Sequence, residues 1–287
     1  MNEYLLSVVF GIIEGLTEFL PVSSTAHLRI AEHALGIDLA NGYWKMYAIV
    51  IQLGAILCLP IYFRQRLRDF LVTFPRGKSG ERNWLTHPLT LVLVAFVFTA
   101  IPSLLMSKII GKHLESLRLM AWALILGGIV MWVVDAVYGR ATEKQKTEDV
   151  SQVTGWQAIW IGVCQTVAAV FPGVSRSMAT IAGGQLVGMT RTAALEFSFL
   201  LSIPTMVAAT GYDLLKSLRA GGANPLGTRG IDAHGWLVLA IGFVVSFVVA
   251  YGVVAWFMHW VRRHGFVVFA VYRILVGAAV LVWIARR

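Results

Sequence analysis

The sequence predicts an all-α polytopic membrane protein with six transmembrane helices and two re-entrant broken-helix hairpins, arranged as an inverted-topology repeat. Composition, apolar runs of spanning length and two interrupted apolar runs predict this class. The chain of 287 residues is 57% hydrophobic and only 14% charged, and its mean hydropathy is +0.72. These values exclude an ordinary soluble globular protein.

The first half begins with an interrupted apolar segment at residues 4–35, with Pro21 and hydroxyl side chains in its middle. Proline removes a backbone donor and clashes with the carbonyl four residues earlier, so this segment is expected to form two half-helices that meet at a break. Nearly uncharged runs follow at residues 46–63, 89–107 and 119–134. Each meets or approaches the length of about 20 mostly apolar residues that a helix needs to cross a membrane.

The second half has the same order of elements. Its interrupted segment covers residues 156–190 and is broken by a Pro-Gly pair, hydroxyl side chains and an arginine; the runs that follow cover residues 197–212, 236–258 and 266–284. Arg273 lies within the last run, where a charge is costly without a partner. We expect it to pair with Glu196 or Asp135; direct contact with a ligand is the alternative.

The two interrupted segments are similar to each other. A shared spacing relates Gly11, Glu14 and Pro21 to Gly162, Gln165 and Pro172. Because three spans follow each segment, the chain is expected to be a duplication with repeats at about 1–138 and 152–287 within one domain, 1–287. An odd number of spans inverts the second repeat, and the functional site is expected where the two breaks meet near the middle of the membrane.

The formal net charge is +9, but the basic residues lie mostly in short loops between apolar runs. There they set membrane topology and contact anionic head groups, so we expect membrane lipid and no nucleic acid as partner. Basic residues in the loops 64–88 and 259–265 favour a cytoplasmic position for both loops. Both termini are then expected outside.

The first break, in the motif EGLTEFLPVSSTAH, contains two carboxylates on one helix face. Glu14 and Glu18 are four residues apart, which brings their side chains together on a helix. Two like charges in an apolar setting require a proton, a cation or a metal ion. The alternative is one acid at the aqueous rim and one structural acid.

Hydroxyl groups follow the carboxylates in the same motif. Ser23, Ser24 and Thr25 can cap the helix that restarts after the proline, and free N–H groups at a helix start attract phosphate. His27 lies one turn beyond Ser24. A serine with a nearby histidine and acid is typical of an activated nucleophile, although helix capping alone is the simpler alternative.

The second break, in the motif PGVSRSMAT, has groups suited to an anion. Gly173 allows close approach of the backbone to a ligand, and Arg176 is a permanently charged, fork-shaped donor that matches phosphate oxygens. Hydroxyl groups are supplied by Ser175, Ser177 and Thr180. A structural ion pair of Arg176 with a carboxylate of the first break is the alternative.

Together with the segments EFSFLLSIP and VYR, the paired motifs resemble those of the bacterial undecaprenyl-pyrophosphate phosphatases, also known as bacitracin-resistance phosphatases. The resemblance covers nearly the whole chain. It implies hydrolysis of undecaprenyl diphosphate to undecaprenyl phosphate and inorganic phosphate, which recycles the carrier lipid for cell-wall synthesis and gives bacitracin resistance. It also implies a place in the bacterial cytoplasmic (inner) membrane, with the active site facing the outer side.

The resemblance assigns roles to residues of both motifs. The expected catalytic residues are Ser24, His27, Glu18, Glu14 and Arg176. The expected substrate-binding residues are Ser23, Thr25, Gly173, Ser175, Arg176, Ser177 and Thr180. Ala26 and Met178 stand where relatives often have glycine, which changes the local backbone or pocket shape and removes no chemical group. A divalent cation, Mg²⁺ or Ca²⁺, is expected at Glu14 and Glu18, and a homodimer is a further expectation.

In the expected mechanism Ser24 attacks the terminal phosphorus while His27, helped by a carboxylate, takes its proton, and Arg176 stabilises the phosphate oxygens. Attack by His27 itself or by an activated water is equally compatible with the sequence. Two other functions remain open at this point. Inverted repeats with broken helices are also a transporter architecture, and Ser24 with His27 could serve an intramembrane protease.

Overall fold

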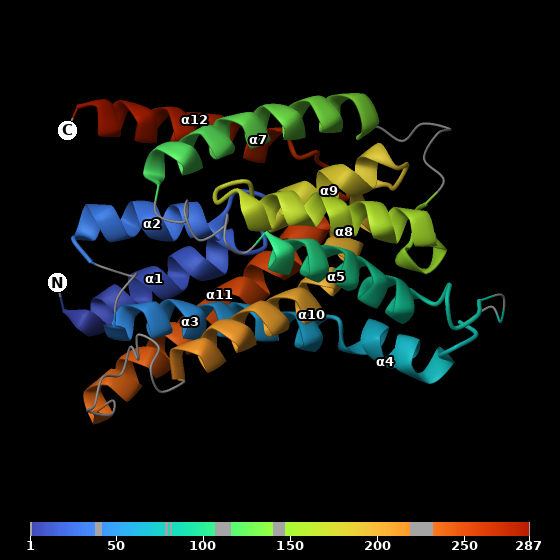
Figure 1. The fold of residues 1–287 in the computed structure, drawn as a ribbon, viewed down its shortest axis with the longest axis horizontal. Coiled ribbons are helices and arrows are strands. Elements are labelled where there is room, and N and C mark those ends of the chain that lie inside the picture. Colours follow the sequence, from blue (N-terminus) through green and yellow to red (C-terminus); the bar gives the residue numbers. More distant parts are fainter. Residues whose placement is uncertain are drawn as a thin grey trace.

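The computed structural model describes residues 2–37, 42–77, 80, 82–106, 116–139, 147–218 and 232–286. Secondary structure within these ranges is helical, apart from an isolated parallel bridge between Thr147 and Met189 (Figure 1). The helices are α1 (Glu3–Thr17), α2 (Ser24–Leu35), α3 (Gly42–Tyr62), α4 (Arg64–Thr73), α5 (Pro88–Leu105), α7 (Leu117–Tyr138), the 3-10 helix η1 (Val150–Gln152), α8 (Gly155–Val170), α9 (Arg176–Leu186), α10 (Arg191–Leu218), α11 (Ala233–Val261) and α12 (Val267–Ala285).

The spanning helices agree with the prediction. Helices α5, α7, α10, α11 and α12 are each long and apolar enough to cross a membrane, and α3 with α4 forms a sixth candidate span that is bent by 62°. The protein is therefore a multi-pass membrane protein. Helix α4 corrects the expectation of a loop over residues 64–88: its arginines made it look like a connection, but it is helical and buries Phe70 against the core.

Both interrupted segments are broken helices, as predicted. The first break lies between α1 and α2, and the second lies between α8 and α9. Each ends in a serine with a positive φ that caps the next helix: Ser23 (φ 74°) accepts from the N–H of Ala26, and Ser175 (φ 73°) accepts from the N–H of Met178. The structural match therefore pairs Ser23 with Ser175, one residue later than the match of the two prolines, because one more residue separates the proline from the serine in the second break.

The arrangement of the helices relates the two halves. In Figure 1 the α1–α2 pair lies toward the end of the molecule that carries both termini, and the α8–α9 pair lies toward the other end. Helix α1 packs on α11, α8 packs on α5, and α7 packs on α12. Each first half-helix thus contacts the corresponding span of the other half. The duplication itself stays a prediction, which this arrangement supports.

Two glycines allow these half-helices to approach their partners closely. A β-carbon at Gly11 would lie 2.9 Å from the carbonyl oxygen of Gly242 in α11, and one at Gly162 would lie 2.4 Å from the carbonyl oxygen of Ala95 in α5. Both distances are shorter than a van der Waals contact. Gly11 and Gly162 are the first members of the predicted repeat spacing, and the structure gives them the same packing role.

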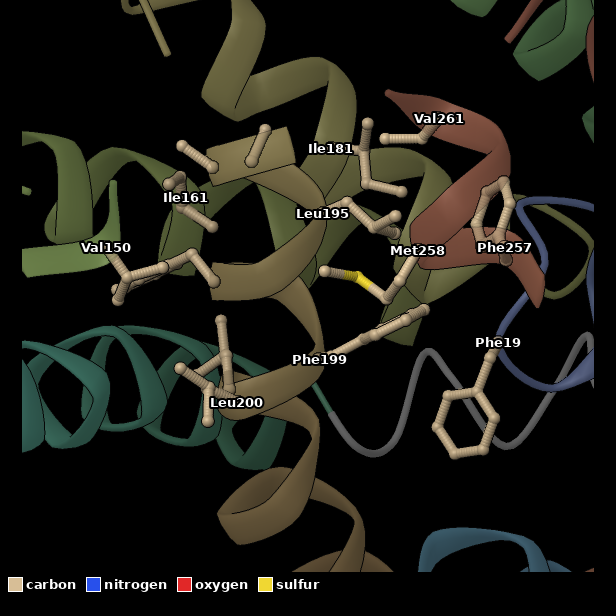
Figure 2. Close-up of a cluster of buried hydrophobic side chains, with 14 of the residues drawn as sticks. Phe19, Val150, Ile161, Ile181, Leu195, Phe199, Leu200, Phe257, Met258 and Val261 are labelled. Carbon is tan, nitrogen blue, oxygen red and sulfur yellow. The ribbon is translucent and has the colours of Figure 1, made fainter. Parts of the chain in front are cut away.

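The hydrophobic core beside the breaks is built around α10. Figure 2 shows Leu195 and Phe199 of α10 among buried side chains of neighbouring helices, including Phe257 of α11. Phe19, in the first break, packs edge-to-face on Phe199 with ring centroids 5.4 Å apart. This aromatic contact anchors the first break to α10, the helix that follows the second hairpin.

Candidate active site

The two breaks meet at the carboxylate of Glu18. The hydroxyl of Ser24 donates to Oε2 of Glu18 at 2.5 Å, and Nη2 of Arg176 donates to Oε1 at 3.1 Å. Glu18 and Ser24 are each 7% exposed. One carboxylate thus joins the predicted nucleophile of the first half to the predicted phosphate-binding arginine of the second half, across more than half the chain.

Arg176 is held by α10 as well. Its Nη1 donates to the hydroxyl of Ser202, and Ser202 itself donates to the carbonyl oxygen of Ser198 at 2.7 Å. Its Nε is buried and has no hydrogen-bond partner. The guanidinium therefore keeps one donor free beside the carboxylate that it pairs with.

The hydroxyls of the second break form a short network. The side chains of Ser175 and Ser177 are hydrogen-bonded at 3.0 Å, and Ser177 donates to the carbonyl oxygen of Leu20 in the first break at 3.0 Å. Thr180 is hydrogen-bonded to Ser198 of α10 at 2.6 Å. All three predicted hydroxyl groups of this motif are buried, and one of them links the two breaks directly.

Gly173 has a packing reason for its position. Its φ is +95°, and a β-carbon there would lie 2.8 Å from the carbonyl oxygen of Met120 in α7. The close approach seen in the structure is therefore to a helix. Thr25, predicted to bind substrate, is exposed. Ala26 and Met178 are both buried.

His27 is not the partner of Ser24. Its Nδ1 lies 2.8 Å from the carbonyl oxygen of Ser23, and its Nε2 lies 2.8 Å from the hydroxyl of Tyr272, on whose ring it stacks. A carbonyl oxygen only accepts, so Nδ1 carries a proton and Nε2 of a neutral ring accepts from Tyr272. The expected Ser24–His27 pair is thus replaced by Ser24–Glu18, because the turn after Pro21 directs the serine hydroxyl back toward α1.

Glu14 is fully buried, and neither of its carboxylate oxygens has a hydrogen-bond partner. It interacts electrostatically with Glu18 and Arg176, and its carboxyl group is placed to share a hydrogen bond with that of Glu18 when one of the two is protonated. A carboxylate without donors needs a proton or a cation. Among the described residues no group of three or more His, Cys, Asp or Glu could hold a metal ion. Because Mg²⁺ is commonly bound by one or two carboxylates together with substrate phosphates, Glu14 and Glu18 fit a cation that arrives with its substrate.

Comparison with known proteins agrees with this geometry. The family model described as "Bacitracin resistance protein BacA" matches residues 7–279. The chain belongs to this family. It is 65% identical to the "Undecaprenyl-diphosphatase" of Koribacter versatilis over all of both chains. It is 40% identical to a protein of that name from Caldanaerobacter subterraneus, covering 100% of this chain and 98% of the relative. A third, from Rhizobium etli, is 42% identical, with 97% and 96% covered.

For this member of the BacA family, the structure corrects the predicted partner of Arg273. Asp135 is paired with Arg191 at 2.7 Å, and Glu196 is paired with Arg66 at 2.6 Å. Arg273 instead donates to three backbone carbonyl oxygens. The sequence does not show that Asp135 and Glu196 already have partners, because Arg191 and Arg66 lie in other segments of the chain.

Three residues beside the site were missed by sequence reasoning. Ser198 and Ser202 lie four apart in the segment EFSFLLSIP, so they face the same side of α10 and reach Thr180 and Arg176. Tyr272 precedes the intramembrane arginine and binds His27. A pair of serines at helical spacing inside an apolar run was the signal that could have identified two of them.

Proposed function

We propose that this protein hydrolyses undecaprenyl diphosphate to undecaprenyl phosphate and inorganic phosphate, recycling the carrier lipid for cell-wall synthesis and giving bacitracin resistance. One observation carries the proposal: a buried serine beside one helix break and an arginine beside the other both donate to the same carboxylate inside a multi-pass membrane protein. The names of the relatives support the same substrate.

In the proposed reaction the oxygen of Ser24 attacks the terminal phosphorus and Glu18 takes the hydroxyl proton. A bond forms between the serine oxygen and phosphorus, and the bond from phosphorus to the oxygen of the lipid monophosphate breaks. Water then hydrolyses the phosphoserine and releases inorganic phosphate. Glu18 is preferred to His27 as the base because it already accepts the hydrogen bond from Ser24 at 2.5 Å.

Charge stabilisation is proposed to come from the second half. Arg176 moves from its ion pair to the phosphate oxygens, for which its planar donors are suited. Helices α2 and α9 begin at Ser24 and Arg176, so the positive ends of two helix dipoles are directed at the site. The remaining proposed substrate contacts are Ser23, Thr25, Gly173, Ser175, Ser177 and Thr180.

We propose that Glu14 and Glu18 hold a divalent cation, Mg²⁺ or Ca²⁺, when the diphosphate is bound. Such an ion would neutralise charge on the diphosphate. The buried oxygens of Glu14 that lack hydrogen-bond partners support this role. Loss of activity on addition of a chelator, restored by Mg²⁺ or Ca²⁺, is the expected result.

The proposed location is the bacterial cytoplasmic membrane with the site open to the outer side. The support is the charge of the segment between α3 and α5, which carries Arg64, Arg68 and Arg76 and is expected on the inside; Lys78 lies outside the described residues. Both termini are then outside. We also propose a homodimer, which the mass of the purified protein in detergent would test.

The deciding experiment measures phosphate release from a long-chain prenyl diphosphate by the purified protein in detergent. Wild type is compared with Ser24→Ala and Arg176→Ala, and with Ser151→Ala and Arg76→Ala as matched controls at exposed positions. Rapid release by wild type and both controls, lost in the two site variants, is expected. Folded wild type that binds the lipid without releasing phosphate would instead indicate a carrier.

A further inference from the structure

Arg273 is the largest fully buried side chain of the described residues. It lies in a membrane-spanning helix, and its hydrogen-bond partners are unusual for a charged side chain in that position. Its relative exposure is 0%, and no described acidic residue forms an ion pair with it. Nη1 donates to the carbonyl oxygen of Pro21 at 3.0 Å; Nη2 donates to that of Gly173 at 3.0 Å and to that of Ala123 at 3.1 Å. A guanidinium kept in an apolar setting by carbonyls alone calls for a specific purpose.

Two of these three acceptors lie in the helix breaks. Pro21 belongs to the first break and Gly173 to the second, where backbone carbonyls have lost their helical partners and would be costly to leave unsatisfied. Each acceptor lies two residues before the positive-φ serine that restarts its helix, Ser23 or Ser175. One side chain therefore binds structurally equivalent carbonyls in both halves of the protein.

The surroundings of Arg273 are shaped to receive it. Helices α7 and α12 pack on each other, and α7 has two successive glycines at the contact. A β-carbon at Gly127 would lie 2.3 Å from Nη2 of Arg273, and one at Gly128 would lie 3.3 Å from its β-carbon. The planar guanidinium fits only because α7 has no side chain at Gly127.

The carbonyls bound by Arg273 are close in sequence to the reacting groups. Pro21 lies three residues before Ser24, and Gly173 lies three residues before Arg176. The planar donor fork fixes the directions of its hydrogen bonds, so it sets the distance between the two breaks. Ser177 adds a second link, through its hydrogen bond to the carbonyl oxygen of Leu20.

We propose that Arg273 is a positioning residue that holds the two helix breaks together, so that Ser24 and Arg176 reach the same carboxylate, Glu18. It touches neither the nucleophile nor the carboxylate in the described contacts. Its effect on the reaction is through the geometry of both breaks at once. The inference rests on the proposed phosphatase activity for one of its two tests and is independent of that activity for the other.

The first test separates kcat from KM. Purified wild type is compared with Arg273→Lys, which keeps the charge but not the planar fork, with Arg273→Met, and with Gly127→Ala, which leaves the arginine and displaces its guanidinium. Matched controls are Arg263→Lys, at an exposed position, and Gly252→Ala, where a β-carbon has no neighbour within 4 Å. Elution as a single species and the thermal midpoint identify folded variants.

We expect kcat to fall roughly tenfold or more in Arg273→Lys and Gly127→Ala and about a hundredfold in Arg273→Met, with KM within about threefold of wild type. The controls keep wild-type kcat. This pattern is expected because a shift of about 1 Å between reacting groups can slow the chemical step by about a hundredfold. KM changes little because the lipid tail still binds.

The second test needs no activity. Spin labels are placed at Leu35→Cys of α2 and Leu186→Cys of α9, in a background with Cys58 and Cys164 replaced by alanine. They report the distance between the two hairpins, and both positions are exposed. Pulsed electron paramagnetic resonance is expected to give a narrow distance distribution when Arg273 and Gly127 are both present. The distribution should broaden in the Arg273→Lys and Gly127→Ala variants.

If wild type releases no phosphate, the proposed function fails and the distance measurement still decides the role of Arg273. Folded Arg273→Lys with kcat within about twofold of wild type and an unchanged distance distribution would overturn the proposal. Loss of folded protein in all three variants would also overturn it, because Arg273 would then serve the fold as a whole.

Discussion

The two helix breaks have the same backbone design and opposite chemistry. Both restart a helix from a serine with a positive φ, Ser23 or Ser175. The next residue is Ser24 in the first break and Arg176 in the second, and both bind Glu18. A pair of equivalent backbones thus brings a hydroxyl and a fixed positive charge to one carboxylate. A difference of one residue at equivalent positions therefore gives the first half the hydroxyl and the second half the positive charge.

A second pair of equivalent positions differs in the same way. Glu14 and Gln165 have the same place in the predicted repeat. The side-chain nitrogen of Gln165 donates to the hydroxyls of Thr99 and Thr205 at 3.2 Å and 3.1 Å, whereas Glu14 has no hydrogen-bond partner. The second half uses the amide nitrogen at this position for structure, whereas the role proposed for Glu14 is to bind a cation.

The largest expected effect comes from removing the first break's hydroxyl. Ser24→Ala should lower kcat by on the order of a thousandfold or more, since loss of a nucleophile removes the covalent route. Glu18→Gln should lower it by a similar factor because the amide oxygen can still accept the hydrogen bond from Ser24 but cannot take its proton. Rapid-quench trapping with labelled substrate checks the route. A phosphoenzyme on His27 in place of Ser24 would contradict it.

Arg176, the charged residue beside the second break, is tested by a substitution that keeps its charge. Arg176→Lys keeps the charge and loses the fork, so it should lower kcat by roughly a hundredfold, comparable to loss of one oxyanion donor. The same exchange at exposed Arg263 is the control. Activity of Arg176→Lys equal to wild type would mean that Arg176 acts as a simple point charge.

The Glu14–Gln165 comparison can be sharpened with paired variants. Glu14→Gln should lower activity at a fixed Mg²⁺ concentration and raise the Mg²⁺ concentration for half-activation about tenfold, because one carboxylate ligand is lost. Gln165→Ala should leave that concentration unchanged and lower the thermal midpoint, since two hydrogen bonds are lost. An unchanged metal dependence in Glu14→Gln would argue for a proton rather than a cation at this buried acid.

A smaller effect on kcat is expected at Tyr272, the hydrogen-bond partner of the His27 side chain at Nε2. Tyr272→Phe removes the hydroxyl that donates to Nε2 and keeps the stacked ring. It should lower kcat about threefold to tenfold, within the range of a lost neutral hydrogen bond of about 1 kcal/mol. His27→Ala should cost less than Glu18→Gln. The reverse order would restore histidine as the base for Ser24.

The smallest expected effects on the reaction are those of the paired packing glycines. Gly11→Ala and Gly162→Ala should each destabilise the protein by about 1–3 kcal/mol through overpacking, measured as a lower thermal midpoint in detergent. Gly162→Ala should cost more because its β-carbon would meet a carbonyl oxygen at the shorter distance. The variant Gly252→Ala, with open space around it, is the control.

The sequence predicted the breaks and their meeting because local chemistry determines both. Proline favours a helix break, and the helices do end beside Pro21 and Pro172, whereas Pro60, Pro102 and Pro204 lie inside α3, α5 and α10. The similar spacing around Pro21 and Pro172 predicted that the halves come together. The partner of Ser24 could not be read from spacing, since Glu18 lies across the break, where helical periodicity no longer applies. His27 had the better helical spacing, but in the structure Ser24 donates to Glu18 and His27 contacts Tyr272.

The partners of Arg273 could not be predicted for another reason. Backbone carbonyls are present at every residue, so their use as acceptors has no signature in the sequence. The acids Asp135 and Glu196 are visible in the sequence as possible partners of a buried arginine. The prediction that one of them pairs with Arg273 was wrong, because Asp135 pairs with Arg191 and Glu196 pairs with Arg66. Helix α4 was missed because its charges resemble those of a loop, although it packs Phe70 inward.

The glycine at position 127 has a consequence for how the two halves can differ. Helices α7 and α12 pack on each other, and at this contact there is room for one guanidinium. A side chain at position 127 would collide with Arg273, so α12 can supply the long side chain only where α7 has none. This contact therefore cannot be filled alike from both helices.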